Sequence, residues 1–560
     1  MSKVKQAKKR HEALKIEKQW HYPEWDKASV YVANSGRTFS SKNYDSKMLL
    51  EGIFDAHPIK SNERLASSLM GMLWQSGAKS MRIEPVKEIA DSNEVKDYFE
   101  QANEITQREF DAPEARLTTT LQEYFLEQGA FGTSGIGVFE GDQSALSFQH
   151  WGLRDVVIDE GRNGFVDTIF AEFEWTVKKI VDTYGQDKVS EKIRELYKAS
   201  KFDDKAMIVM AIQPRSHAER KNAKGNRAMA YSSLHFEQDS EHLLKESGFH
   251  SIPVMVSRFE KYSQSKYGRG PGLNALADIM MLNAIVEAMI VAIEKKLSPA
   301  LGVLHEDILG GSAIDTSAGA MNVLNTLAGQ SGGNPVFPLF DVGELQSTQF
   351  LIEKLTTSIS EHFHIDRLLD FNNDTQMTLG EVQIRNTYRN QSLGSIFARQ
   401  EAELFTPMIE RGVGILLRRG YLGTIPGYAV GRGEIKEVPR AILDLASQGK
   451  DFYKVKYFNP ASRLKKAEEA QGIQQAYEFG GQLAQVDPGV LDNFDHDESV
   501  RVIADIAGAP KAIIRDKKEV EQIRAKRNQD MTENKELEKA KVAAETAKTA
   551  QEAENLGDAV

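Results

Sequence analysis

The stretch "KYGRGPGLNALADIMMLNAIVEAMIVAIEKKLSPALGV", from Lys266 to Val303, decides how this chain is organised. It begins with a cluster of three glycines in five residues and continues without a break into a long apolar segment. The three glycines are Gly268, Gly270 and Gly272. Pro271 suits the first turn of a helix, and the Ser298-Pro299 pair favours a stop. The stretch therefore predicts a glycine-rich turn that leads into one long helix.

A glycine-rich turn before a helix has two interpretations. It can hold a phosphate, but a Walker loop needs GxxxxGK[ST], and "YGRGPGLNAL" has no such Lys-Ser/Thr pair. A dinucleotide fingerprint needs GxGxxG, and Leu273 stands where its third glycine belongs. We therefore expect a structural turn, in which the glycines let the chain turn sharply from a strand at 252–262 into the helix.

The helix itself is apolar on most of its circumference between Leu273 and Ile293. Carboxylates inside it would make a membrane span costly, so we expect it to be buried by protein. Asn283, Glu287 and Glu294 are spaced to share one face, which predicts a single polar stripe. A helix that is apolar on most sides needs neighbours on most sides, and neighbouring copies of the chain would serve.

The segments on either side of this helix extend the pattern. Residues 300–345 are rich in Gly, Ala, Ser and Pro and predict a compact irregular insert with short strands at most. An apolar stripe at 344–364 predicts a second helix, so the two helices can return side by side with the insert at their tip. Upstream, short β-rich runs and helical segments predict a mixed α+β first half.

A third long helix is expected after the polar loop "DFNNDTQ", beginning at "TLGE". Pro407 predicts a kink within it, and Arg418-Arg419-Gly420 is typical of a helix C-terminus. Further helices are expected at 462–485 and 496–507. The segment 517–553 is polar on all faces, so we expect it to assemble with copies of itself or to stay mobile.

Composition narrows the class of protein. The 560 residues carry a net charge of −11 and no cysteine, which excludes thiolate chemistry and argues against a protein that grips DNA tightly. The basic segment 1–20 is expected to fray. His362 and His364 are two apart and make poor co-ligands, and the acidic turn 492–499 fits helix capping by Asp495 or Asp497 better than calcium. We expect no catalytic residue, no metal site and no cofactor, hence no enzyme.

The order of these parts resembles the podovirus-type portal proteins of bacteriophages, also called head-to-tail connectors. Four stretches carry the likeness: "NERLASSLMGMLWQSGAKSMRIEP", the stretch quoted first, "FNNDTQMTLGEVQIRNTYRNQSLGSIFARQEAELFTPMIERGVGILLRRG", and a C-terminal region from "NPASRLKKAEEAQGIQQAYEFGG" to "EVEQIRAKR". Together they span most of residues 45–527. No single motif is specific to the family, but their order and spacing are.

The resemblance implies a helix-rich α+β portal fold assembled as a ring. Its parts would be a basic N-terminal arm, wing, first stem helix, clip, second stem helix, tunnel loop, long wing helix, crown, and a charged C-terminal helix that forms a barrel or a mobile tail. In that order they would occupy residues 1–20, 21–265, 266–298, 299–345, 346–365, 366–376, 377–430, 431–516 and 517–560.

The resemblance also implies a function. Portals are rings, usually of twelve subunits, at one capsid vertex, through which double-stranded DNA is packaged and later ejected. The implied partners are other copies of the chain, a terminase, adaptor and tail proteins, the major capsid and scaffold proteins, and transiently bound DNA, with no membrane. The implied location is the virion, after assembly in the bacterial cytoplasm. The residues expected to face DNA in the tunnel loop are Asn372, Asn373, Asp374 and Gln376.

Two alternatives stay open at this point. Another packaging component, such as a terminase subunit, would need a phosphate-binding loop, which the sequence lacks. A non-enzymatic cytosolic scaffold that assembles through its C-terminal helix would need sustained apolar a and d positions, which 517–553 lacks.

Overall fold

The computed structural model divides the chain into two compact units. One contains Met1–Ala90 and Tyr98–Ser462, and the other contains Asp91–Asp97 and Arg463–Val560. The residues that it describes are 3–41, 51–74, 80–90, 92–221, 223–305, 314–325, 336–339, 346–365, 393–428, 435, 437–458, 460–484, 487–506, 515 and 517–557. The first unit mixes helices and sheets, which confirms the predicted α+β class.

A five-stranded antiparallel meander, in the order β4-β5-β6-β7-β8, forms the largest sheet of the first unit. The strands are β4 (Val156–Glu160), β5 (Val166–Thr176), β6 (Lys205–Pro214), β7 (Tyr231–Glu237) and β8 (Leu243–Phe249). Successive residues of a strand point to opposite faces, so both faces acquire an apolar core. Ile208 packs on one side with α6 (Val177–Tyr184) and α7 (Glu191–Lys198), and Val209 packs on the other.

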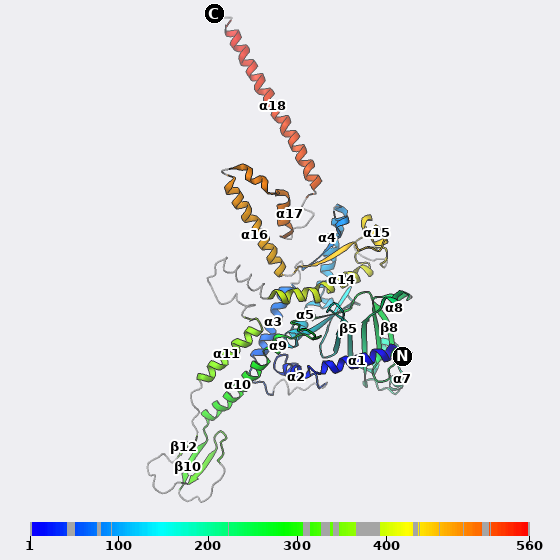
Figure 1. Cartoon of the computed structure of the whole chain (residues 1–560), viewed down its shortest axis with the longest axis vertical. Coiled ribbons are helices and arrows are strands. Elements are labelled where there is room, and N and C mark those ends of the chain that lie inside the picture. The colour runs from blue at the N-terminus through cyan, green and yellow to red at the C-terminus, as the bar shows by residue number, and fades with distance from the viewer. Residues whose placement is uncertain are drawn as a thin grey trace. The chain divides into compact units, whose positions relative to one another are not determined.

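The second face of this sheet is covered by α1 (Lys3–Gln19), so the N-terminal segment is not a frayed arm as the sequence led us to expect. Figure 1 shows α1 lying across the strands of the sheet. Its buried side chains recur every three or four residues and so share one helix face. They are Val4, Ala7, His11, Leu14 and Lys18. The stripe was missed because two of its five positions carry polar residues.

A smaller sheet, in the order β3-β2-β9, forms the centre of the first unit. Its strands are β2 (Thr133–Glu140), β3 (Leu146–Trp151) and β9 (Val254–Arg258), all antiparallel. Helix α5 (Leu117–Phe131) leads directly into β2 through Gly132, whose φ of 81° suits the residue that follows a helix. Helix α3 (His57–Leu73) packs on α5.

Two short strands join distant parts of the chain. β1 (Met81–Pro85) pairs antiparallel with β13 (Tyr453–Tyr457), in a register that places Ile83 opposite Val455. The remaining elements include the 19-residue α4 (Asn93–Asp111), which buries Phe99, Ile105 and Phe110. The others are α2 (Tyr22–Tyr31), α8 (His217–Lys221), α15 (Arg440–Ser447), η2 (Lys87–Ile89), η3 (Pro113–Ala115) and η4 (Gly225–Ala228).

The two predicted helices around the insert are present. α9 (Pro271–Asn274) is followed after one residue by α10 (Leu276–Leu297), and α11 (Gln346–His362) returns beside α10. Figure 1 shows the pair side by side, with the insert at its end. The described part of the insert has the expected short strands: β10 (Leu301–His305) lies between β11 (Met321–Asn325) and β12 (Val336–Pro338).

The third predicted helix is described from residue 393 onward. Near Pro407, where the sequence predicts a kink, the chain forms η5 (Glu401–Phe405), a single π-helical turn before α14 (Thr406–Arg418). Proline has no backbone N–H to donate, and here the Thr406 N–H bonds to the Glu401 carbonyl five residues back. The predicted C-terminus is confirmed: Gly420 has φ 75°, and the N–H groups of Gly420 and Tyr421 close the helix on Leu417 and Leu416.

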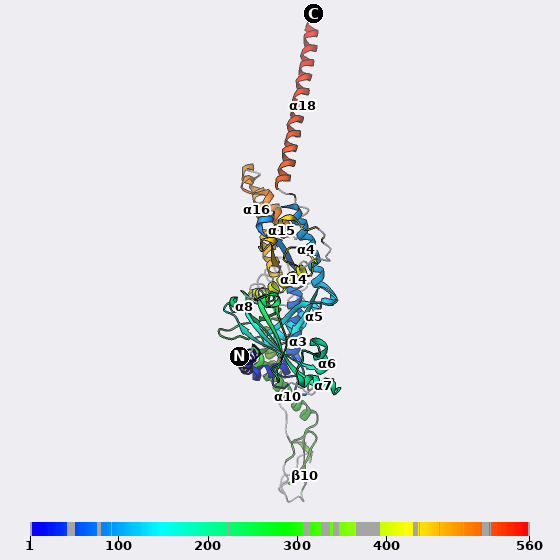
Figure 2. The same ribbon diagram turned by 90° about the vertical axis from the view of Figure 1, so that its right-hand side faces the viewer.

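The second unit is almost entirely helical. It contains most of α16 (Pro460–Leu483), η6 (Pro488–Asn493), α17 (His496–Ile506) and α18 (Lys517–Gly557), close to the predicted spans. Asp495 accepts the Glu498 N–H, so it performs the predicted capping of α17. Figure 2 shows α18 as one uninterrupted helix, and the Arg524 guanidinium binds both carboxylate oxygens of Asp497 at 2.6 Å.

Candidate functional site

The glycine turn before α10 is a short hairpin rather than a phosphate cradle. Glu260 and Arg269 pair as an antiparallel bridge, and the reversal between them occurs around Gln264, which has φ 66°. The three glycines lie after the reversal, and none of them has a positive φ. The expectation that the glycines make the sharp turn was therefore wrong.

The glycines are needed because the chain passes very close to the end of α5. A Cβ atom on Gly268 would lie 2.3 Å from the Gly132 carbonyl oxygen. A Cβ on Gly270 would lie 2.7 Å from the Gln128 oxygen, and one on Gly272 would lie 2.9 Å from the Ala130 oxygen. Real side chains do not tolerate contacts of this length with backbone, so each position requires glycine.

The side chain of Arg269 fixes the start of α9. Its Nε donates to Asn274 Oδ1 at 2.8 Å, its Nη2 donates to the Leu273 carbonyl at 3.1 Å, and its Nη1 pairs with Glu24 of α2. Asn274 in turn donates to Glu260 Oε2 at 3.2 Å. Pro271 is the first residue of α9, where its missing N–H leaves no bond unmade.

The polar stripe predicted on α10 divides into two environments. Asn283 is buried, and its amide bonds the backbone of the segment before α3: Oδ1 accepts the Phe54 N–H at 2.8 Å, and Nδ2 donates to the Gly52 carbonyl at 2.9 Å. Glu287 and Glu294, about one and three turns further on, are exposed. Within one subunit, Asn283 is therefore an anchor, and only the two carboxylates face outward.

The outer part of α10 exposes large apolar side chains. Ile290, Ile293 and Leu297 recur on one face and are between 37% and 82% exposed. Phe350, near the start of α11, is 70% exposed. By length and composition, α10 is the one helix within the described residues that is apolar enough to cross a membrane. Large apolar side chains that gather on an exposed surface indicate an interaction surface.

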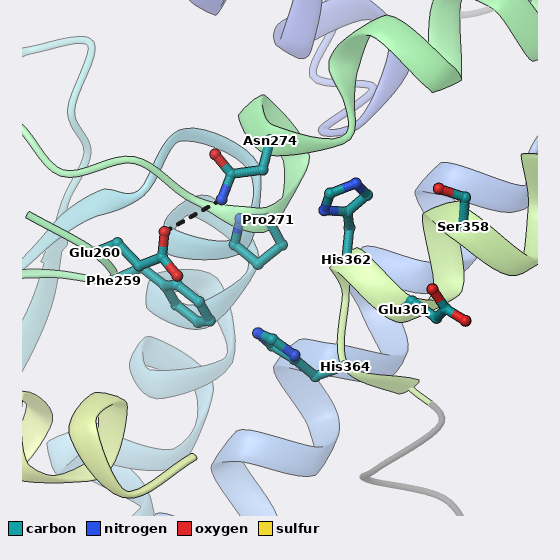
Figure 3. A pocket seen from close by; sticks show the side chains of 8 residues that line it. All are labelled: Phe259, Glu260, Pro271, Asn274, Ser358, Glu361, His362 and His364. Carbon is teal, nitrogen blue, oxygen red and sulfur yellow. Dashed lines mark hydrogen bonds between the residues drawn. The ribbon is translucent and has the colours of Figure 1, made fainter. Parts of the chain in front are cut away.

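A cavity of about 200 Å³ lies where the glycine turn meets the end of α11. Its lining comes from the hairpin, from α9 and from α11, as Figure 3 shows. The residues are Phe259, Glu260, Pro271, Asn274, Ser358, Glu361, His362 and His364. His362 and His364 therefore do meet at one cavity, with His364 stacked on Phe259. Among the described residues, however, no three His, Asp or Glu side chains form a group that could hold a metal ion.

Three hydrogen-bond contacts hold α11 in place beside this cavity. Ser358 Oγ donates to Asp278 Oδ2 of α10 at 2.7 Å, and His57 of α3 lies 3.0 Å from Ser360 Oγ and 3.2 Å from the Thr356 carbonyl. The α10–α11 pair is thus tied to the sheet-bearing part of the unit at its base, while its outer half is exposed.

A buried ion cluster below the hairpin is a feature that sequence reasoning missed. Arg258, at the end of β9, is 1% exposed and pairs with Glu160 at the end of β4 and with Glu403 in η5. Glu160 also pairs with Lys261 at 2.7 Å. The available signal was one arginine inside the apolar run "VMVSRFEKY", but its partners lie about 100 and 145 residues away.

A second cluster ties the hairpin to α1. Lys266 pairs with Glu17 at 2.7 Å and with Asp159 at 3.1 Å, and Arg10 also pairs with Asp159. Burial opposes the charge on both Lys266 and Asp159, but their ion pairs outweigh it. The pKa of Lys266 is therefore raised and the pKa of Asp159 is lowered.

The tunnel-loop residues predicted to face DNA lie outside the described residues. These are Asn372, Asn373, Asp374 and Gln376. The last described residue before them is Ile365, which follows the cavity wall directly. The described part of the site therefore consists of two features. One is the junction between the hairpin and the α10–α11 pair, held by hydrogen bonds and ion pairs, and the other is the exposed apolar surface of that pair.

Comparisons with known proteins match the chain to a family of phage connectors and to two phage portal proteins. The model of the family described as bacteriophage head to tail connecting protein matches residues 4–514. The portal protein of Salmonella phage epsilon15 is 23% identical over 445 residues, which cover 78% of this chain and 75% of that protein. The probable portal protein of Bordetella phage BPP-1 is 24% identical over 526 residues, covering 92% and 89%.

Among solved structures, the virion of a native gene transfer agent particle matches at 10% identity and a TM-score of 0.32. That match covers 78% of this chain and 90% of the other. A TM-score of this size is too low to relate the two folds in detail.

Proposed function

Because the chain belongs to the bacteriophage head to tail connecting protein family, we propose that it is the portal subunit whose copies form a ring around a DNA channel at one capsid vertex. The family match spans more than nine tenths of the chain and concerns connectors, so neither a terminase subunit nor a cytosolic scaffold is favoured. The family membership follows from the comparisons, and our proposal adds the ring, its twelve-fold symmetry and the channel.

The observation that carries the ring is the exposed apolar surface of the α10–α11 pair. Ile290, Ile293, Leu297 and Phe350 would lie in water in a single subunit. In a ring, each helix pair has a neighbour on both sides, so these side chains can be buried by the next copy. Glu287 and Glu294 are exposed on the same helix and would remain solvated.

The proposed parts follow the chain order. The stem is α10 with α11, the clip is the insert that contains β10, β11 and β12, and the wing is the sheet-bearing region that α1 and α14 cover. The crown would begin near residue 431 and α18 would form the C-terminal barrel or tail. β13, which falls in the proposed crown span, pairs with β1, so that span starts on the first unit.

DNA would pass through the channel without being held. Phosphate contacts by Lys and Arg supply most of the affinity of DNA-binding proteins, and the net charge of −11 disfavours such a grip. Four of the seven cations of α1 give a local example. Lys3, Lys8, Arg10 and Lys15 are all paired with carboxylates of the same chain.

The proposed partners are a terminase during packaging, then adaptor and tail proteins, with the major capsid and scaffold proteins around the vertex. The proposed location is the virion, after assembly in the host cytoplasm. The protein itself would act as a connector and not as an enzyme.

Electron microscopy and native mass spectrometry of the purified protein test the ring. We expect ring particles with a central hole of duplex width, and a mass of about 750 kDa if twelve copies of the 62.6 kDa chain assemble. A chain that stays monomeric at all concentrations, and also in the presence of capsid and scaffold proteins, would contradict the proposal.

The tunnel loop has its own test. Replacing Asn372, Asn373 and Gln376 with alanine should reduce the DNA content of assembled heads while rings still form. Unchanged DNA content in heads that carry the variant would remove these residues from the channel but would leave the ring intact.

A further inference from the structure

Helix α1 covers one face of the five-stranded sheet as a separate layer. Its apolar contacts with the sheet are few. Val4, Ala7 and Leu14 pack against a floor of apolar side chains from β4, β5, β6 and β7. The floor is formed by Val157, Phe170, Val209, Ala211, Leu234 and Phe236.

Around this small apolar contact lies a frame of ion pairs. Lys3 pairs with Glu246 at 2.7 Å, Lys8 with Glu241 at 3.2 Å, and Arg10 with Asp159 at 2.9 Å. These pairs lie on the rim, and partly exposed pairs add little to stability. Two less exposed pairs, Lys15 with Glu172 and Glu17 with Lys266, also join α1 to β5 and to the hairpin, and they have to break when α1 opens.

Two titratable side chains of α1 are buried beneath the helix. His11 is 1% exposed, stacks on Phe170, and makes no hydrogen bond through either ring nitrogen, although Nε2 is 3.4 Å from Glu172 Oε1. Lys18 is also 1% exposed, and its Nζ donates to the Arg154 carbonyl at 2.8 Å. A charge on either side chain is unfavourable while α1 lies on the sheet, because the charged group is then removed from water. The cost disappears when α1 leaves the sheet and the side chain is solvated.

We propose that α1 is a pH-dependent strap, which lies closed on the sheet while His11 and Lys18 are neutral and opens as these two side chains take up protons. Opening would uncover the apolar floor and release a basic helix. The proposal does not depend on the portal assignment, because it concerns contacts within one subunit.

The surrounding charges support this direction. Burial lowers the pKa of His11 to about 4, opposed by Glu172 on β5 and assisted by Lys15 and Lys18 on α1. Burial lowers the pKa of Lys18 to about 7, opposed by Glu172, by Asp155 before β4 and by Glu127 on α5, and assisted by Lys15. A lowered pKa means that the open state binds protons more tightly, so falling pH favours opening.

Asp155 works in the other direction. Burial raises the pKa of its carboxyl group, so protonation of Asp155 at acid pH favours the closed state. This effect is confined to the acid range in which Asp155 titrates. His11 acts between pH 6.5 and about 4, and Lys18 acts between about 10.5 and 7.

The absence of cysteine makes opening measurable, because one introduced thiol is then the only one. Ala7→Cys places a thiol beneath α1, and Gln6→Cys places one on its exposed side. The ratio of their reaction rates with 4,4′-dithiodipyridine reports the opening constant and cancels the pH dependence of the thiol. Ala102→Cys, buried in α4, reports unfolding of the subunit.

We expect the Ala7→Cys opening constant to rise about tenfold per pH unit as pH falls from 9 to 7, and again from 6.5 to 5. Lys18→Met should abolish the pH dependence of the opening constant between pH 9 and 7, and His11→Leu should abolish it between pH 6.5 and 5. Lys9→Met, which removes an exposed lysine on the same helix, should change neither. Three results would each overturn the strap. The first is a wild-type rate ratio that does not change with pH, and the second is a pH dependence that both Lys18→Met and His11→Leu leave unchanged. The third is a thiol at Ala102→Cys that becomes reactive together with the one at Ala7→Cys.

Discussion

Arg258 and Glu403 form a buried ion pair although 145 residues separate them in the sequence. The Arg258 Nε donates to Glu403 Oε2 at 3.2 Å, and the Arg258 backbone N–H donates to the same oxygen at 2.9 Å. One carboxylate in a π-helical turn thereby joins β9, the hairpin and the long helix that follows the proposed tunnel loop.

Glu403→Gln should destabilise the subunit by about 3 kcal/mol, because it leaves Arg258 buried with only Glu160 to balance its charge. Chemical denaturation followed by circular dichroism measures the change. The matched control is Glu174→Gln, which breaks the exposed pair with Lys205 and should cost less than about 0.5 kcal/mol. Equal effects of the two variants would show that the buried pair has no special role.

Gly270→Ala should lower the melting temperature strongly, because the new methyl group would lie 2.7 Å from backbone atoms of α5 and Gly132. Gly71→Ala is the control: Gly71 is exposed within α3, and a Cβ atom added there would meet nothing within 4 Å, so alanine should stabilise α3 by about 0.5–1 kcal/mol. Differential scanning fluorimetry compares them. A Gly270→Ala protein that melts with the wild type would refute the close approach.

Asn283→Ala should destabilise the subunit by about 2 kcal/mol, since the Phe54 N–H and the Gly52 carbonyl would lose their partners. Glu287→Ala, one turn further along α10 and exposed, should leave stability within about 0.5 kcal/mol of the wild type. Denaturant titration of both variants separates the anchor from the outward-facing carboxylate. The interpretation fails if Glu287→Ala is the more damaging change.

The sheet should lose stability in acid through His235. Burial lowers the pKa of His235 to about 4, and its Nδ1 lies 2.7 Å from the Tyr184 hydroxyl. Because the folded-state pKa lies below the unfolded value of 6.5, stability is lost as pH falls from 6.5 to about 4, by at most about 3 kcal/mol. His235→Phe should remove part of this slope in denaturation curves measured between pH 7 and 4.5. An unchanged slope would assign the acid sensitivity to other groups.

Ile290→Asp should block assembly without unfolding the subunit, because the side chain is 48% exposed in a single chain and is buried only by a neighbouring copy in the proposed ring. Lys295→Asp changes an exposed polar residue of the same helix and is the matched control. Native mass spectrometry gives the oligomeric state, and circular dichroism confirms the fold. Rings that form normally with Ile290→Asp would exclude this face from the subunit contact.

Much of the local structure was predictable. The start of the helix at Pro271, the end of α10 before Pro299 and the Gly420 C-terminus all follow from residues that act on their own backbone. Such signals depend on φ restrictions, missing N–H donors and glycine freedom, which do not require knowledge of distant contacts.

The roles of individual side chains were less predictable. Helical spacing placed Asn283, Glu287 and Glu294 on one stripe, but spacing cannot show that the segment around Gly52 and Phe54 covers only the first of them. The glycines of the turn illustrate the same limit. Their number was evident, but their purpose depends on how closely α5 passes.

The sequence by itself determined the α+β class, the order of helices around the insert and the likeness to portal proteins. These depend on hydrophobic periodicity, on the Gly and Pro residues that end helices and strands, and on the order of segments along the chain. Only the tertiary structure decided that a basic N-terminal segment is a packed helix, that Arg258 meets Glu403, and that the outer half of α10 is uncovered. These facts depend on which distant surfaces meet, and the periodicity within one segment does not identify the surface that covers it.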